Sequence, residues 1–101
     1  MRPIVWSVKV RQDYFDILNY IASDNPLAAE RVVDVIEETV DKLGDFATGK
    51  PGRVVGTYEK IIYPLPYIVA YTITTDAGRE IVSILRVIHT SRDWPSEGWP
   101  E

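Results

Sequence analysis

Three consecutive segments rich in Val, Ile, Tyr and Thr constrain the fold of this chain most strongly. They cover residues 54–63, 67–74 and 80–89. These residue types favour β-strands, and the segments are separated by the turn-forming sequences PLP at residues 64–66 and DAG at residues 76–78. Short turns of this kind join antiparallel strands. The sequence therefore predicts a three-stranded antiparallel meander in the second half of the chain.

The first half of the chain predicts one short strand and two helices. Residues 3–7 form an apolar run too short for a helix, and Ser7 can cap the helix that follows, where apolar residues recur at helical spacing. Asn25 followed by Pro26 marks a second helix, because Asn supplies a capping oxygen and proline suits the first helical position. This second helix is expected to stop at Gly44, a suitable C-cap.

This order of elements predicts an α+β fold, β-α-α-β-β-β. Two helices joined by so short a connection form a hairpin, and their apolar stripes must be buried against the sheet. We therefore expect an antiparallel sheet with the two-helix hairpin packed on one face. Residues 1–101 are long enough for one hydrophobic core and are expected to form a single domain, with residues 95–101 as a flexible tail.

The opposite face of the predicted sheet is also apolar. Both alternating sets of residues in the last two strands contain Ile, Val or Ala. Two interpretations remain open at this point. An exposed apolar face would be a docking surface for another chain, whereas a covered face would lie beneath the C-terminal tail.

Composition excludes several classes of function. The chain has no cysteine and one histidine, which excludes disulfides and a cysteine nucleophile and leaves few ligands for zinc. We expect no metal and no cofactor. The longest apolar runs are far shorter than the ~20 residues of a membrane span, and the first residues do not resemble a signal peptide. A cytoplasmic location without membrane contact is therefore expected.

The charge balance disfavours binding to nucleic acid through a general electrostatic field. The formal net charge is −4, whereas phosphate contacts require a basic surface. Acidic residues gather in the second helix, and most of the basic residues belong to the strand region. We expect no direct sequence-specific binding of nucleic acid, although a locally basic sheet remains compatible with this pattern.

The order of the motifs resembles the RelE/ParE superfamily, the toxins of bacterial toxin–antitoxin modules that are also called plasmid stabilisation proteins. The resemblance spans residues from about 4 to 95. The motifs that carry it are Trp6 before the first helix, the linker DNP at residues 24–26, GKPGRV at 49–54, GTYE at 56–59, PYIVAY at 66–71, ILRVIH at 84–89, and Arg92 with the WP pair at 94–95.

This resemblance implies a toxin that a cognate antitoxin holds inactive. RelE-like members cleave messenger RNA on the ribosome, and ParE-like members poison DNA gyrase. RelE-like members place basic residues on the central strands, but the matching positions here are Glu59, Ile61 and Ile68. The resemblance therefore favours the ParE-like branch, in which gyrase is the target and no catalysis is needed.

Two alternatives remain. A ribonuclease needs groups that accept a proton, stabilise the phosphate and protonate the leaving oxygen, and Lys60, His89 and Arg92 would be its catalytic candidates. The chain could instead be an inactive module that only binds an antitoxin. In a purely structural interpretation, His89 has no catalytic role and forms a hydrogen bond within the fold.

Candidate binding residues follow from the same resemblance and from side-chain chemistry. Trp and Arg dominate protein interfaces, and apolar helix residues could receive the antitoxin, which the resemblance says wraps around the toxin. In the structural interpretation, at least one of Arg86 and Arg92 is paired with a carboxylate inside the fold. The candidates for target binding are Arg53, Arg86, Arg92, Trp94 and Trp99, and those for antitoxin binding are Tyr14, Leu18, Ile21, Val33 and Ile36.

Overall fold

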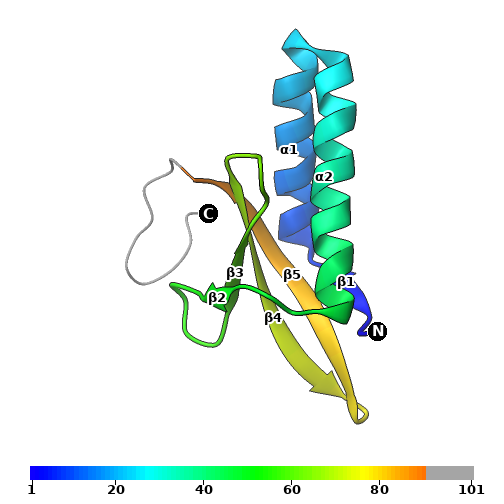
Figure 1. Cartoon of the computed structure of the whole chain (residues 1–101), viewed down its shortest axis with the longest axis vertical. Helices are drawn as coiled ribbons and strands as arrows, with labels where there is room; N and C mark the ends of the chain where they lie inside the picture. The colour runs from blue at the N-terminus through cyan, green and yellow to red at the C-terminus, as the bar shows by residue number, and fades with distance from the viewer. Residues whose placement is uncertain (91–101) are drawn as a thin grey trace.

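The computed structural model describes residues 1–90, in which two helices pack on one side of a five-stranded sheet (Figure 1). The predicted order of a strand, two helices and three strands is confirmed, and β2 is an additional two-residue strand. In chain order the elements are β1 (Ile4–Trp6), α1 (Val8–Asp24), α2 (Pro26–Asp45), β2 (Lys50–Pro51), β3 (Tyr58–Ile61), β4 (Tyr67–Asp76) and β5 (Arg79–His89).

Both predicted helix starts are confirmed by their caps. The Ser7 side-chain oxygen accepts a hydrogen bond from the Val10 N–H at 3.1 Å. The Asn25 side-chain oxygen accepts one from the Ala28 N–H at 3.1 Å, and Pro26 occupies the first position of α2. Each cap satisfies an N–H group that has no partner within its helix.

Gly44 is not the C-cap that the sequence predicted. The helix α2 continues to Asp45, and its C-cap is Phe46, which has an extended backbone. Gly44 is buried where α2 meets the N-terminal segment, and its carbonyl accepts a hydrogen bond from the Arg2 N–H at 2.8 Å. A Cβ at position 44 would lie 2.9 Å from the Arg2 carbonyl oxygen. The glycine is needed for this close approach of two backbones.

The sheet is mixed, whereas the sequence predicted an antiparallel one. Its strand order is β1-β5-β4-β3-β2. The strands β3, β4 and β5 form the predicted antiparallel meander. The first strand, β1, lies parallel to the last, β5, pairing Ile4 with Val82. A parallel pair requires a long connection, and here the chain between β1 and β5 runs through both helices and the strands β2, β3 and β4.

The turn between β4 and β5 is the predicted one at residues 76–78. Ala77 and Gly78 connect the strands, and both have positive φ angles of 52° and 78°. A two-residue hairpin turn with two positive φ angles matches the twist of the flanking strands.

The main core lies between the helices and one face of the sheet. The buried helix residues Val10, Ile36 and Val40 belong to one cluster with Tyr71 and Ile84 of the sheet. Tyr71 is fully buried, and its hydroxyl donates a hydrogen bond to the Thr48 carbonyl oxygen at 2.6 Å. Tyr71 therefore serves packing within the core.

The opposite face of the sheet is not an open apolar surface at its centre. Ile68, Ala70 and Ile88, which alternate with the core-facing residues, are 7%, 0% and 3% exposed. Of the two interpretations left open by the sequence, an exposed docking face does not hold at these three positions. The alternative, cover by the tail from Pro95 onward, concerns residues outside the described part of the chain.

Neither described helix is long and apolar enough to cross a membrane.

Replacing the α2 cap tests the local origin of the fold. We expect Asn25→Ala to lower the free energy of unfolding by about 1 kcal/mol, because the Ala28 N–H loses its partner. Asn19→Ala is the matched control, since Asn19 is an exposed residue within α1 and its loss should change stability by less than ~0.5 kcal/mol. Urea unfolding followed by circular dichroism measures both. An equal effect of the two substitutions would contradict the assignment.

Candidate functional site

An ion pair between α1 and β5 forms the base of the candidate site. Arg86 donates two hydrogen bonds to the Asp13 carboxylate, from Nε to Oδ2 at 2.7 Å and from Nη2 to Oδ1 at 3.0 Å. Both side chains are largely buried. The Val87 N–H also donates to Asp13 Oδ2, at 3.1 Å. One carboxylate therefore satisfies three donors of β5.

The start of α1 replaces a missing strand at this edge of the sheet. The strand β1 ends at Trp6, so the edge of β5 beyond it has no strand partner. Ser7 covers the next two carbonyl groups, donating from its N–H to Ile84 at 3.1 Å and from its hydroxyl to Leu85 at 3.2 Å. Asp13 then accepts from Val87. Buried backbone groups need such partners.

A β-bulge shifts the register of β5 just before this ion pair. Ala70 pairs with Arg86, whereas the next residue of β4, Tyr71, pairs with Ile84. Leu85 is therefore the extra residue, and bulges of this kind redirect the side chains that follow. The bulge is a device that no propensity pattern in the sequence predicts.

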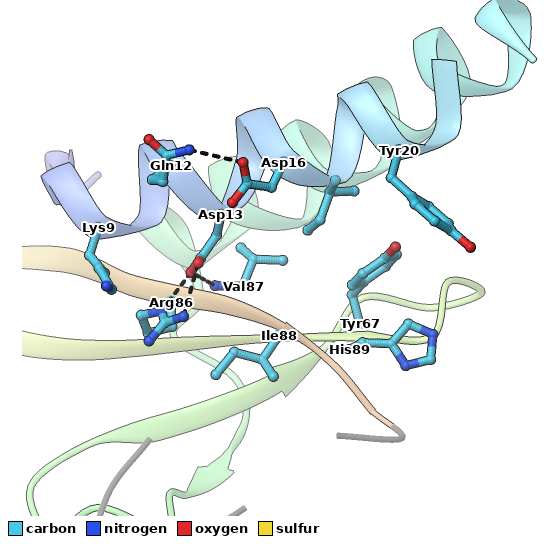
Figure 2. Close-up of a pocket in the computed structure, with 11 residues that line it drawn as sticks. Lys9, Gln12, Asp13, Asp16, Tyr20, Tyr67, Arg86, Val87, Ile88 and His89 are labelled. Carbon is cyan, nitrogen blue, oxygen red and sulfur yellow. Dashed lines mark hydrogen bonds and ion pairs between the residues drawn. The ribbon is translucent and has the colours of Figure 1, made fainter. Parts of the chain in front are cut away.

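A groove of about 520 Å³ opens between α1 and the end of β5 (Figure 2). The rings of Tyr67 and His89 meet edge to face, with centroids 5.3 Å apart. Tyr20 of α1 faces them across the groove. Burial raises the pKa of Tyr67, and the neighbouring Tyr20 adds to the increase. Ile17, Val87 and Ile88 also line the groove, which can therefore hold an aromatic or apolar group.

The described ribonuclease candidates do not meet in this groove. His89 lies on β5 opposite Tyr67, and Lys60 lies on β3 opposite Val69, so β4 separates their strands. His89 lines the groove and Lys60 does not. Arg92, the third candidate, lies outside the described residues. Within residues 1–90 no group of three His, Asp or Glu side chains could hold a metal ion.

Glu59 stands where a RelE-like ribonuclease would carry a cation, and it has a structural partner. Glu59 is buried, and its carboxylate accepts a hydrogen bond from the Arg53 N–H at 2.9 Å. The Arg53 Nε lies 3.6 Å from the same carboxylate. This contact holds the loop before β3, whose tip residue Val55 is 98% exposed. Sequence analysis missed Val55, because an exposed valine has no local signal.

The target-binding candidates have different positions in the fold. Arg53 is partly exposed and lies on the loop that Glu59 holds. Arg86 is buried in the ion pair with Asp13, which is the structural role expected of at least one of Arg86 and Arg92. It therefore does not offer its guanidinium to a target. Arg92, Trp94 and Trp99 lie outside the described residues. Asp13 itself escaped the sequence analysis, although it sits at the edge of the apolar stripe of α1.

The antitoxin-binding candidates are not all at the surface. Ile36 is 0% exposed and belongs to the core, so its selection as a contact residue was wrong. Tyr14 and Ile21 are half-buried and pack against the same core. Leu18 and Val33 are half-buried residues of α1 and α2. The apolar stripes of the hairpin are mostly used up by the fold itself.

Tyr14 joins both helices to β1. Its ring meets Trp6 edge to face at 5.7 Å, and its hydroxyl donates a hydrogen bond to Glu37 of α2 at 3.2 Å. Burial first, and then the charge of Glu37, raises the pKa of Tyr14 to about 12. This raised pKa keeps the hydroxyl a donor up to strongly alkaline pH.

Removing the Asp13 carboxylate should be strongly destabilising. We expect Asp13→Ala to lower the free energy of unfolding by ~3–5 kcal/mol, because Arg86 would remain buried without its counter-ion. Asp16→Ala, one turn away on α1, removes an exposed carboxylate bonded to Gln12 and should cost less than ~0.5 kcal/mol. Chemical denaturation compares the two. A loss for Asp13→Ala as small as that of the control would contradict the role of the ion pair.

The raised pKa of Tyr14 predicts a loss of stability at alkaline pH. An unfolded tyrosine ionises near its usual pKa of 10, whereas the folded Tyr14 stays neutral up to about 12. The stabilisation is therefore fully present below pH 10 and is lost as the pH rises to about 12. The ultraviolet absorbance of tyrosinate follows the titration. We expect Glu37→Gln to lower the pKa of Tyr14, and an unchanged titration would contradict the contribution of Glu37.

Comparison with known proteins identifies the family. The family described as the ParE toxin of the type II toxin–antitoxin system parDE matches residues 4–94. A Sinorhizobium fredii protein described as the toxin Y4kP is 39% identical over 95 residues, which cover 93% of this chain and 94% of the relative. Toxin RelE2 of Caulobacter vibrioides is 27% identical over 93 residues, 91% of this chain and 99% of the relative.

The fold is similar to that of a chain from the chromosomal ParDE toxin–antitoxin system of P. aeruginosa. The TM-score is 0.80 at 22% identity, over 90% of this chain and 98% of the other. This structural likeness supports the fold, and the sequence match over residues 4–94 decides the family. The chain described here belongs to the ParE toxin family and is the toxin of a type II toxin–antitoxin system.

Proposed function

We propose that this toxin inhibits DNA gyrase and that a cognate antitoxin neutralises it. The observation that carries this proposal is the chemistry of the central strands. The positions at which RelE-like ribonucleases carry cations hold Glu59, Ile61 and Ile68, and of these Glu59 and Ile68 are buried. A buried carboxylate would repel an RNA phosphate, and isoleucine offers it no hydrogen bond. Inhibition by binding needs no such groups.

The arrangement of the described polar residues supports binding over catalysis. General acid–base catalysis requires the participating groups within hydrogen-bond reach of the reacting atoms. Lys60 and His89 lie on strands that flank β4, and Lys60 does not line the α1–β5 groove that His89 lines. The carboxylates of Asp13 and Glu59 already accept hydrogen bonds from within the fold. These groups support the structure of the toxin.

The loop at residues 52–57 is the part of the described surface best suited to contact gyrase. Several hydrogen bonds hold it, including one from the Thr72 hydroxyl of β4 to the Gly56 carbonyl at 3.1 Å. The Arg53 N–H donates to Glu59, the Gly52 N–H donates to the Thr57 carbonyl at 2.8 Å, and the Thr57 hydroxyl donates to the Val54 carbonyl at 2.6 Å. A loop held in this way presents an apolar tip at little entropic cost of binding. Arg92, Trp94 and Trp99 remain proposed contacts in the C-terminal segment.

The helical hairpin is the proposed contact surface of the antitoxin. Leu18 and Val33 retain partial exposure on neighbouring helices, and Tyr14 and Ile21 are half-buried. An antitoxin segment bound there would cover apolar surface that the fold leaves accessible. Acting on gyrase also requires the toxin to be in the bacterial cytoplasm.

A gyrase assay tests the proposed function. Purified toxin is added to gyrase with relaxed plasmid and ATP, and both supercoiling and cleaved DNA are followed. We expect supercoiling to stop and cleaved DNA to accumulate. Unaffected supercoiling at toxin concentrations that arrest growth would contradict the proposal. Ribosome-dependent cleavage of messenger RNA would then become the leading account.

A substitution at the loop tip tests the proposed contact. We expect Val55→Asp to raise the concentration needed for half-inhibition of gyrase by about tenfold or more, because a charge would have to be buried against the target. The fold should be unaffected, since Val55 is 98% exposed. Leu27→Asp, at the exposed start of α2, makes the same chemical change elsewhere. Equal inhibition by the two variants would rule out the loop tip as a contact.

A further inference from the structure

The outer side of α1 carries apolar residues that the core does not use. Val8 and Phe15 are 85% and 62% exposed. They lie seven residues apart, with Arg11 between them, and therefore share one face of the helix. This face is turned away from the stripe that includes the buried Val10. Single exposed apolar residues are ordinary, but Arg11, which lies between these two, lines a preformed pocket.

The pocket has a volume of about 260 Å³ and is lined by Trp6, Arg11, Tyr14 and Glu37. The edge-to-face contact of Trp6 with Tyr14, and the hydrogen bond from Tyr14 to Glu37, fix the two aromatic rings. Arg11 and Glu37 place opposite charges at its rim. Such a pocket can receive one apolar side chain from a partner.

A second groove, of about 380 Å³, continues from this pocket along α2. Glu37 lines both. The acidic residues that line the second groove are Asp34, Glu37, Glu38, Asp41 and Asp45. Their spacings of three and four residues place like charges side by side, which destabilises a helix. The fold relieves little of this repulsion. Among the described ion pairs, one involves these carboxylates, and it joins Lys42 to Glu38 at 3.1 Å.

The whole net charge of the protein originates in this helix. The helix α2 contains six carboxylates and two cationic side chains, so its net charge of −4 equals the formal charge of the complete chain. The rest of the chain is neutral on balance. An acidic ridge beside an apolar pocket is complementary to a basic, amphipathic partner.

We propose that the antitoxin segment that binds this outer hairpin surface, defined by Val8, Arg11, Phe15, the Trp6–Tyr14 pocket and the α2 carboxylates, is a basic amphipathic helix. One apolar side chain of that helix fills the pocket, and its Lys or Arg residues lie along α2. A helix is the occupant because the surface is formed mainly by side chains of α1 and α2, with Trp6 of β1 contributing its ring to the pocket. The backbone groups of the two helices are bonded internally and offer no edge to a strand. The inference rests on the proposed neutralisation by an antitoxin.

Designed peptides test the charge and shape of the partner. The first probe is an ~18-residue amphipathic helix of Leu and Lys, and the second has the same apolar face with Glu in place of Lys. Both are titrated calorimetrically into the full chain at low salt. We expect the Lys peptide to bind at least about tenfold more tightly than the Glu peptide. Added salt should weaken the binding of the Lys peptide.

Charge-reversal variants separate this surface from a general electrostatic effect. Glu37→Lys with Asp41→Lys should abolish the preference for the Lys peptide. The control, Asp24→Lys with Asp76→Lys, makes the same change in net charge at exposed positions outside the groove and should keep the preference. Thermal unfolding confirms that both variants are folded. Equal affinities of the two peptides for the unmodified chain, or equal losses in both variants, would overturn the inference.

The gyrase assay separates this inference from the proposed function. If the chain prefers the Lys peptide but leaves gyrase active, the result supports the proposed surface and contradicts gyrase as the target. If the chain inhibits gyrase but shows no preference between the peptides, the result contradicts this inference alone. The variant with Glu37→Lys and Asp41→Lys should inhibit gyrase as the unmodified toxin does, because the surface serves the antitoxin.

Discussion

The rest of the structure depends on the ion pair and hydrogen bonds of the Asp13 carboxylate. This carboxylate is the point at which the first helix is bound to the last strand, through the guanidinium of Arg86 and the N–H of Val87. The stretch of chain between these partners includes the rest of α1, the whole of α2 and the strands β2, β3 and β4. Burying the two charges costs several kcal/mol of desolvation each, which their mutual bonds must offset. The pair therefore fixes one position of α1, because other positions would leave a charge buried alone.

The use of polar groups inside the fold supports the proposal that the toxin acts by binding. Asp13 forms an ion pair with Arg86, and the Glu59 carboxylate accepts a hydrogen bond from the backbone N–H of Arg53. Arg86 and Arg53, which were candidates for target binding, thus take part in the contacts that hold the α1–β5 junction and the loop before β3. The described surface includes an apolar loop tip at Val55 and the acidic face of α2. Both features fit the proposed recognition of other proteins.

The sequence predicted what depends on neighbouring residues and missed what depends on distant ones. The caps at Ser7 and Asn25, the helical periods and the hairpin turn at Ala77 and Gly78 are local signals, and the structure confirms them. The parallel pairing of β1 with β5 joins segments about 78 residues apart, and no local pattern specifies it. Gly44 was misread for the same reason, since its role is set by the backbone of Arg2.

The candidate site was predicted less well than the fold. Residue type alone separated neither Ile36, which the core absorbs, nor Arg86, which pairs with Asp13, from residues that are exposed. The burial of a given apolar or charged side chain depends on which face another element covers, and this is tertiary information. The family was predictable because it is carried by the order and spacing of many short motifs, and residues 4–94 match it as a whole.

The most direct test of binding without catalysis is the inhibition of gyrase by a toxin that lacks both described catalytic candidates. Lys60→Ala and His89→Ala are combined, the fold is checked by thermal unfolding, and the concentration for half-inhibition of supercoiling is measured. The account predicts a value within about twofold of the unmodified toxin, the range expected for surface substitutions. A folded variant that no longer inhibits gyrase, or that loses a ribosome-dependent cleavage of messenger RNA shown by the unmodified toxin, would contradict it.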